Sequence, residues 1–344
     1  MDHHRTQAKQ SGGEDGAGGA RPSSPSPRHD RRFTLRGLCK RGLRTTLELG
    51  QRIGLSILPR HFYSEVPDFR ALRRDTRWRR PRSMVGVSGT DLRGQLDFVA
   101  RCCTPDRIER LCQANIHAQA CADNGGPGYG QIEAEFLHAF IQETRPPQVI
   151  QVGCGVATAV MLRAAAEVAH QMELICIDPF PNHFLKTAAD DGRLRLIDAP
   201  AQQLDPEFFE DLQTGGLLFV DSSHVVGPGS EVNLLILEVL PRLRPGHWIH
   251  FHDIYFPYDY QRGLLDDELF FSNETALLLA LLTSNPNLTI RASLSMLHYR
   301  CPEGLRQFLP NYLPAGNSDG LEASEGHFPS SIFLEVVGEQ SVPG

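Results

Sequence analysis

The pattern of apolar and polar positions changes near residue 146. Beyond it, short apolar runs such as QVIQV, ELICI and GLLFV take turns with helical stretches such as ATAVMLRAAAEVAHQ. Strands without polar alternation are typical of sheets buried on both faces, and strand–helix alternation favours parallel βαβ units. The pattern therefore predicts an α/β domain over residues 146–340, built on a doubly wound, mostly parallel sheet. The late runs LTIRASL (288–294) and SIFLEVV (331–337) could add antiparallel edge strands.

The first 93 residues have a different texture. Residues 1–30 are rich in Gly, Ser, Pro, Arg and His and hold almost no large apolar side chains, which predicts a disordered tail. Residues 31–93 are expected to form a basic helical arm and connector. Within them, leucines spaced among Arg and Lys predict an amphipathic helix over 33–58, whereas the arginine-rich stretch 60–93 should be extended.

Helical periodicity returns in residues 94–145, which we expect to form a helical cap that leads into the α/β domain. The stretches LRGQLDFVARCC, PDRIERLCQAN and IEAEFLHAFIQET carry apolar residues at helical spacing. The glycine-rich sequence NGGPGYG at 124–130 should interrupt these helices.

Charge separates the first 93 residues from the rest of the chain. They carry 20 Lys and Arg against 9 Asp and Glu, although the whole chain has a net charge of −7. The remaining body is therefore acidic, which argues against a nucleic-acid substrate. The basic N-terminal arm could contact an anionic membrane surface or a protein, or it could pack on the acidic body.

Three features bear on the location of the protein in the cell. The sequence has no run of about 18 apolar residues, and its first residues lack the apolar segment of a secretory signal. Its eight cysteines form no CxxC pair, which argues against a structural zinc site. These features predict a cytoplasmic protein with reduced thiols.

Ligands of doubly wound sheets bind beyond the carboxyl ends of the strands, so the residues that follow each apolar run are candidates. Gly153 and Gly155 follow the first predicted strand and would let a ligand approach the backbone closely. Asp178 follows the second strand at a spacing suited to a nucleoside-binding unit, where it could accept both ribose hydroxyls. Small residues around Ala199, after the third strand, could border an adenine ring.

Polar side chains gather after the fourth and fifth predicted strands. Asp221, Ser222 and His224 follow one strand, and His252 and Asp253 follow the other. We expect Asp221, His252 and Asp253 to converge at one mouth of the sheet, where they could form an acid–base relay or bind a hard divalent cation such as Mg²⁺. His224 could act as a base or contact the substrate, and a purely structural hydrogen bond is an equal alternative.

Several of these segments together carry a resemblance to a known family. VIQVGCG, CIDPFP, DSSHVVGPGSEVN, LEVLPRLRPGHWIHFHDIYFPYDY and NET resemble class I S-adenosylmethionine-dependent methyltransferases, and in particular the bacterial group called methyltransferase domain family 24. The resemblance covers roughly residues 85–300. It implies a Rossmann-like, seven-stranded sheet with an N-terminal helical extension, and S-adenosylmethionine as the methyl donor.

The resemblance also implies roles for individual residues at the donor site. Gly153 and Gly155 would lie against the methionine part of the donor, Asp178 would hold its ribose, and Ala199 would face its adenine. The family usually carries an acidic residue where this chain has Gln151, and a glutamine can still form hydrogen bonds there. The implied cofactor-binding set is Gln151, Gly153, Gly155, Asp178, Ala199, Asp221 and Ser222.

The implied reaction is methyl transfer by in-line displacement to a small-molecule or glycan acceptor, at a hydroxyl oxygen. Its catalytic residues would be Asp221, His224, His252 and Asp253. We expect a His or Asp base without a metal, and the second hypothesis is metal assistance through Asp221, His252 and Asp253, because catechol-type O-methyltransferases bind magnesium at similar positions.

Two other functions remain as alternatives at this point. One is a non-catalytic nucleoside-binding or interaction domain. The other is a nicotinamide-dependent oxidoreductase, which is less favoured because Thr158 stands where a dinucleotide site prefers a third glycine.

Overall fold

The described part of the protein comes from a computed structural model. It comprises residues 35–56, 66–261, 271–317, 320–323 and 328–338. The chain divides into two units, Met1–Glu65 and Val66–Gly344. The predicted disordered tail, residues 1–30, lies outside the described residues.

The first unit contains the described helix α1 (Leu35–Arg52), which lies inside the predicted span 33–58 but ends earlier. Gly54 takes a left-handed backbone conformation with φ 78°. The Leu55 N–H donates to the Gly50 carbonyl at 2.8 Å, which is a common way for glycine to close a helix end. No described helix is long and apolar enough to cross a membrane.

The arginine-rich stretch 60–93 is not uniformly extended, as the sequence led us to expect. Its described part contains the short helix α2 (Phe69–Arg74) and the 3₁₀ turn η1 (Thr76–Arg79). Asp68 and Asp75 start these two turns, because each side chain accepts a hydrogen bond from the backbone N–H two residues later. Asp68 and Asp75 therefore cap two short helical turns within this arginine-rich segment.

The predicted helical cap is present and contains one more helix than expected. The additional helix is α5, whose buried side chains are only Ile116 and Ala120, so it shows no amphipathic stripe that the sequence could reveal. The four helices are α3 (Leu92–Cys102), α4 (Pro105–Gln113), α5 (Ile116–Asn124) and α6 (Gln131–Thr144).

A seven-stranded sheet forms the centre of the second unit, as the sequence and its family resemblance predict. The strand order is β3-β2-β1-β4-β5-β9-β6. The strands are β1 (Gln148–Val152), β2 (Glu173–Ile177), β3 (Arg195–Ile197), β4 (Leu217–Val220), β5 (Trp248–Phe251), β6 (Leu288–Ser293) and β9 (Ile332–Val336). A separate hairpin joins β7 (Pro314–Asn317) and β8 (Gly320–Ala323).

The two late strands differ from the expectation that both form antiparallel edges. β9 pairs antiparallel with β5 on one side and with β6 on the other. β9 is therefore an interior strand, and β6 is the edge strand but runs in the same direction as β5. The long connection from β5 to β6 contains a helix and permits this common direction, whereas the return to β9 reverses it.

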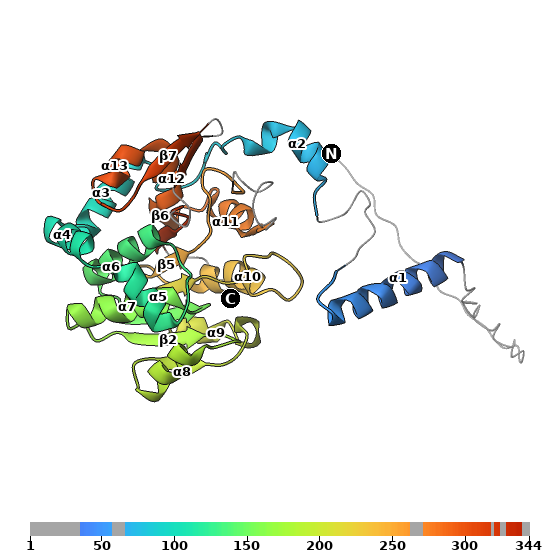
Figure 1. Ribbon diagram of the computed structural model, residues 1–344, viewed down its shortest axis with the longest axis horizontal. Coiled ribbons are helices and arrows are strands. Elements are labelled where there is room, and N and C mark those ends of the chain that lie inside the picture. The colour runs from blue at the N-terminus through green and yellow to red at the C-terminus, as the bar shows by residue number, and fades with distance from the viewer. Residues whose placement is uncertain (1–34, 57–65, 262–270, 318–319, 324–327, 339–344) are drawn as a thin grey trace, which may run out of the picture. The chain divides into compact units, whose positions relative to one another are not determined.

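Helices cover both faces of the sheet, and each face has its own apolar core (Figure 1). Val149 and Phe219 point to the core shared with α3, α5, α6 and α7 (Val156–Glu167), whereas their neighbours Ile150 and Leu218 point to the opposite core. The remaining helical elements are α7 (Val156–Glu167), α8 (His183–Asp190), η2 (Ala201–Gln203), α9 (Glu207–Glu210), α10 (Glu231–Leu234), η3 (Leu235–Val239), η4 (Leu240–Arg242), α11 (Glu274–Leu282), α12 (Leu294–Arg300) and α13 (Pro302–Arg306).

The carboxyl ends of β1 and β4 touch at Gly153. This glycine has φ 77°, and a Cβ added there would lie only 1.7 Å from the carbonyl oxygen of Asp221. The Asp221 N–H in turn donates to the Val152 carbonyl at 2.9 Å. Only glycine allows the loops after these two strands to approach so closely.

Replacing this glycine tests the close approach. Gly153→Ala should lower the free energy of unfolding by about 3 kcal/mol or more, because a backbone clash adds to left-handed strain. Gly192→Ala is the matched control: φ is 71° there, but nothing lies within 4 Å of an added Cβ. Strain alone should cost about 1–2 kcal/mol at that position. Urea unfolding measures the stability of both variants. Equal losses of stability would contradict the close contact between Gly153 and the Asp221 carbonyl.

Candidate active site

A cavity of about 480 Å³ opens at the carboxyl ends of the central strands. Of the residues predicted to bind a nucleoside donor, Gly153, Asp178, Asp221 and Ser222 line it. At the third strand, Pro200 to Gln202 line the cavity in place of Ala199. The structure therefore brings residues from four separate loops to one pocket at the rim where doubly wound sheets bind their ligands.

A larger groove of about 980 Å³ lies elsewhere and is not the candidate site. Pro147 and Glu173 line it, and these residues stand at the amino ends of β1 and β2. It therefore lies at the opposite end of these strands from the residues that the sequence singles out.

Gln151 and Gly155, also predicted to bind the donor, are not among the residues that line the cavity. The Gln151 side chain is fully buried and accepts a hydrogen bond from the Thr158 hydroxyl at 2.9 Å, while its amide donates to the Gly153 carbonyl at 3.0 Å. The Thr158 oxygen also accepts from the Gly155 N–H at 3.1 Å. Gln151 therefore braces the glycine loop from within. Thr158 does the same from the position where a dinucleotide site would prefer glycine.

Asp178 already holds two backbone groups of the cavity wall. Its Oδ2 accepts from the Cys154 N–H at 3.0 Å, and its Oδ1 accepts from the Phe180 N–H at 2.7 Å. Each carboxylate oxygen has a second lone pair, so both can still accept a hydroxyl group. The carboxylate is thus fixed in place beside the cavity and retains capacity for a ligand.

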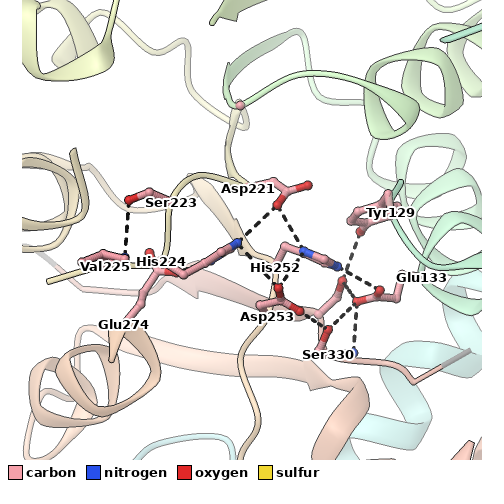
Figure 2. Close-up of polar contacts among 12 residues, drawn as sticks. Tyr129, Glu133, Asp221, Ser223, His224, Val225, His252, Asp253, Glu274 and Ser330 are labelled. Atoms are coloured by element: carbon pink, nitrogen blue, oxygen red, sulfur yellow. Dashed lines mark hydrogen bonds and ion pairs between the residues drawn. The ribbon is translucent and has the colours of Figure 1, made fainter. Parts of the chain in front are cut away.

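The four predicted catalytic residues converge on one point (Figure 2). His252 Nδ1 lies 3.1 Å from Asp221 Oδ1, and His224 Nε2 lies 3.5 Å from the same oxygen. Asp253 Oδ2 lies 3.6 Å from His224 Nε2 and 3.8 Å from His252 Nδ1. Asp221 also lines the cavity, so this His/Asp cluster and the cavity share a wall.

Two members of the His/Asp cluster have an unusual backbone conformation. His224 has φ 59° and Asp253 has φ 54°. Residues other than glycine are uncommon in this left-handed region, although Asp and His tolerate it better than most. The loops after β4 and β5 therefore turn sharply at these two positions, and such strain is often found where a side chain must be placed precisely for function.

Two buried glutamates that the sequence analysis missed hold the outer nitrogens of the imidazoles. Glu133 of α6 lies 3.0 Å from His252 Nε2, and Glu274 of α11 lies 2.8 Å from His224 Nδ1. Their exposed fractions are 2% and 0%. Of these two glutamates, only Glu274 lies in a segment that carries the family resemblance, namely NET. The resemblance gave Glu274 no role. Nothing in the periodicity of α6 distinguishes Glu133.

Two serines and a tyrosine complete the network around Glu133 and Asp253, and Figure 2 labels Ser330 and Tyr129 among them. Ser330 donates to Asp253 Oδ1 at 2.9 Å, and Ser331 donates to Glu133 Oε1 at 2.5 Å. The Tyr129 hydroxyl lies 3.1 Å from the Ser331 hydroxyl and 3.0 Å from His250 Nε2. The segment before β9 and the glycine-rich loop before α6 therefore meet behind the His/Asp cluster.

Burial and charge shift the titration of the cluster. Burial alone would lower the pKa of His224, but its hydrogen bonds with Asp221 and Glu274 raise it to about 10. Burial also opposes protonation of His252, yet the charges of Glu133 and Asp221 raise its pKa well above the ordinary value. Burial would raise the pKa of Asp221, but the charges and hydrogen bonds of His252 and His224 together outweigh burial and lower this pKa. The surrounding carboxylates thus favour the protonated, positively charged form of both imidazoles.

Three members of the His/Asp cluster lie close enough together to bind a cation. One ligand atom each from Asp221, His224 and His252 lies within 4.8 Å of the others. The sequence predicted Asp221, His252 and Asp253 for this role. The structure therefore adds His224 to the residues that could hold a divalent cation, and leaves Asp253 within reach of both imidazoles.

Part of the chain is similar to a known protein family. Residues 150–254 match the family model described as a methyltransferase domain. This segment runs from β1 to just beyond Asp253, so it contains the glycine loop, Asp178 and the whole His/Asp cluster. Together with the strand order of the sheet, the match makes residues 150–254 similar to the methyltransferase domain that the sequence resemblance implies.

Individual relatives add little beyond this class. An uncharacterized protein of Archaeoglobus fulgidus is 25% identical over 171 residues, which cover 47% of this chain and 76% of that protein. The O-methyltransferase TomG from Streptomyces achromogenes, solved with its donor, is 12% identical and covers 68% of this chain and 91% of its own, with a TM-score of 0.37.

A second solved structure is similar to the same extent. The O-methyltransferase from Bacillus cereus, solved in complex with SAH, is 13% identical over the same shares of the two chains, with a TM-score of 0.36. Overlaps with TM-scores below 0.5 are too loose to bear on the acceptor or the mechanism of this chain.

A double-mutant cycle tests the bracing role of Gln151. Gln151→Met and Thr158→Val should each lower the free energy of unfolding by about 1–3 kcal/mol, because each leaves a buried partner unsatisfied. The double variant should cost clearly less than the sum of the two. Chemical denaturation measures all four proteins. Strictly additive losses would show that the two side chains do not act as a pair.

Proposed function

We propose that this chain transfers a methyl group from S-adenosylmethionine to a hydroxyl oxygen of a small-molecule or glycan acceptor. One observation carries the proposal: Asp221 belongs both to the cavity and to the His/Asp cluster. A donor bound in the cavity would therefore lie next to groups that can hold and deprotonate an acceptor.

The cavity residues suit the parts of this donor. We assign Gly153 and Gly155 to the loop along the methionine part, with Gln151 supporting that loop from behind. Asp178 would bind the ribose hydroxyls through the free lone pairs of its fixed carboxylate. Ser222, which lines the cavity, would contact the donor, and the stretch that follows Ala199 would border the adenine.

The reaction would be a single displacement. The acceptor oxygen attacks the methyl carbon, the bond from that carbon to the sulfonium breaks, and the acceptor proton leaves to a base. The sulfonium is a good leaving group, so the protein chiefly positions the acceptor and removes its proton. Asp221, His224, His252 and Asp253 are the groups that we assign to this task.

The geometry bears on the choice between a free His base and metal assistance. Both nitrogens of His252 face carboxylates, as do both nitrogens of His224. An imidazole held in this way has no nitrogen open to an acceptor proton unless a carboxylate partner moves. The ligand types in the cluster suit a divalent cation, which when bound would lower the pKa of a coordinated hydroxyl. The structure therefore favours the second hypothesis of the sequence analysis.

The wider setting of the protein stays a prediction. We expect a cytoplasmic enzyme that does not act on nucleic acid, in keeping with its acidic body. The basic N-terminal arm, including α1, would supply any contact with a membrane surface or another protein.

Donor binding is tested at Asp178. Asp178→Ala should weaken binding of S-adenosylhomocysteine by about 10- to 100-fold, because hydrogen bonds to a charged group contribute about 1.5–3 kcal/mol. Isothermal titration measures the affinity, and a thermal melt checks that the Cys154 loop is intact. Asp191→Ala, at an exposed carboxylate paired with Arg193, should bind normally. Unchanged binding by Asp178→Ala would refute the ribose assignment.

Turnover is tested at the His/Asp cluster. With an acceptor found among phenols and sugars by release of S-adenosylhomocysteine, Asp253→Ala and His252→Ala should lose at least about 100-fold in kcat, as expected when acid–base catalysis is removed. Donor affinity should stay nearly unchanged. His183→Gln, at an exposed position on α8, is the control.

Two results would contradict the proposal. If both cluster variants keep normal turnover, the cluster is not the catalytic site. If the protein binds S-adenosylhomocysteine tightly but methylates no phenol or sugar acceptor, the alternative of a non-catalytic nucleoside-binding domain is favoured.

A further inference from the structure

The His/Asp cluster places two imidazole nitrogens and two carboxylate oxygens around one small space. We propose that this space binds a divalent transition metal of the zinc, cobalt or iron type in preference to magnesium, through Asp221, His224, His252 and Asp253. The inference deepens the proposed function, on which it rests for the role of the metal but not for the binding itself.

The spacing of the ligand atoms fits a single ion. Bonds of ~2.0–2.2 Å in a tetrahedral site hold neighbouring ligand atoms roughly 3.3–3.6 Å apart. The four nitrogen–oxygen distances in the cluster run from 3.1 Å between His252 Nδ1 and Asp221 Oδ1 to 3.8 Å between His252 Nδ1 and Asp253 Oδ2. One ligand atom each from Asp221, His224 and His252 already lies within 4.8 Å of the others, whereas the Asp253 carboxylate would have to move closer to join them around one ion.

The outer nitrogens of both imidazoles are arranged as in metal sites. A metal-bound histidine usually gives its other ring N–H to a carboxylate, which fixes the ring and its tautomer. Glu133 lies 3.0 Å from His252 Nε2, and Glu274 lies 2.8 Å from His224 Nδ1. Each ring is thereby turned so that its remaining nitrogen faces Asp221. Glu133 and Glu274 would act as positioning residues.

The charge of the buried network points to a cation as well. Four carboxylates, those of Glu133, Asp221, Asp253 and Glu274, surround two imidazoles. Glu274 Oε1 is buried and has no hydrogen-bond partner among the described residues. Buried carboxylates are costly unless they are paired or bind a metal, and the two imidazoles balance at most two of these four negative charges, even when both carry an extra proton. A divalent ion held by the inner nitrogens and oxygens would supply the same two positive charges in place of those protons.

The ligand types select the class of metal. Magnesium prefers oxygen ligands and keeps several waters, whereas imidazole suits zinc, iron and nickel and the order of affinities favours later transition metals. Two of the four ligand atoms here are imidazole nitrogens. His252 is the decisive residue, because a glutamate in its place would give three carboxylates and one imidazole, a set closer to the preference of magnesium.

The test measures metal binding without donor or acceptor. Co²⁺, Zn²⁺ and Mg²⁺ are titrated separately into protein freed of metal with a chelator, by calorimetry and, for Co²⁺, by its visible absorption. One Co²⁺ or Zn²⁺ should bind per chain, at least about 100-fold more tightly than Mg²⁺, with the absorption typical of a low-coordinate site.

Four variants assign the ligands. His224→Gln and His252→Glu should each weaken Co²⁺ binding and alter its spectrum, and His252→Glu should also shrink the preference over Mg²⁺. Glu133→Gln should weaken Co²⁺ binding by about 10- to 100-fold while keeping the preference over Mg²⁺. His183→Gln should change nothing. Circular dichroism and thermal melts confirm that each variant is folded.

The outcomes separate this inference from the proposed function. It is overturned if wild-type protein binds neither Co²⁺ nor Zn²⁺, if Mg²⁺ binds equally well, or if Co²⁺ binding survives the changes at both His224 and His252. A protein that binds Co²⁺ through these residues but transfers no methyl group would refute the proposed function and support the metal site.

Discussion

The contact between the backbone of Gly153 and the carbonyl of Asp221 holds the two halves of the site together. Gly153 directly follows β1 and opens the loop along the cavity, whereas Asp221 directly follows β4 and belongs to the His/Asp cluster. Because no side chain separates the two loops, the cavity and the cluster share one wall.

The cluster also depends on charge compensation from elements that lie far apart in the sequence. Glu133 comes from α6 before the sheet, Glu274 comes from α11 after β5, and Ser330 precedes the last strand. Each holds a cluster residue from outside and leaves its inner face directed at Asp221 or Asp253. The helical cap is therefore more than a lead-in, because α6 supplies a buried carboxylate to the site.

Buried polar groups in the site serve two different ends. Gln151 and Thr158 satisfy each other and two glycine backbone groups, so they stabilise the loop without facing a ligand. The His/Asp cluster instead keeps an excess of carboxylates around two imidazoles, which is stable only when positive charge is supplied. The first arrangement is complete among the described residues, whereas the second is the place where we propose that a cation binds.

The sequence by itself determined the α/β class, the strands and the residues at their carboxyl ends, because these follow from apolar periodicity and from the rule that parallel strands present their ends at one rim. It could not place β9 between β5 and β6, since strand order depends on pairing across long separations. Nor could it find Glu133 or the bracing role of Gln151. A buried glutamate on an apolar helix looks like any other polar residue until the tertiary structure brings His252 within 3.0 Å of it.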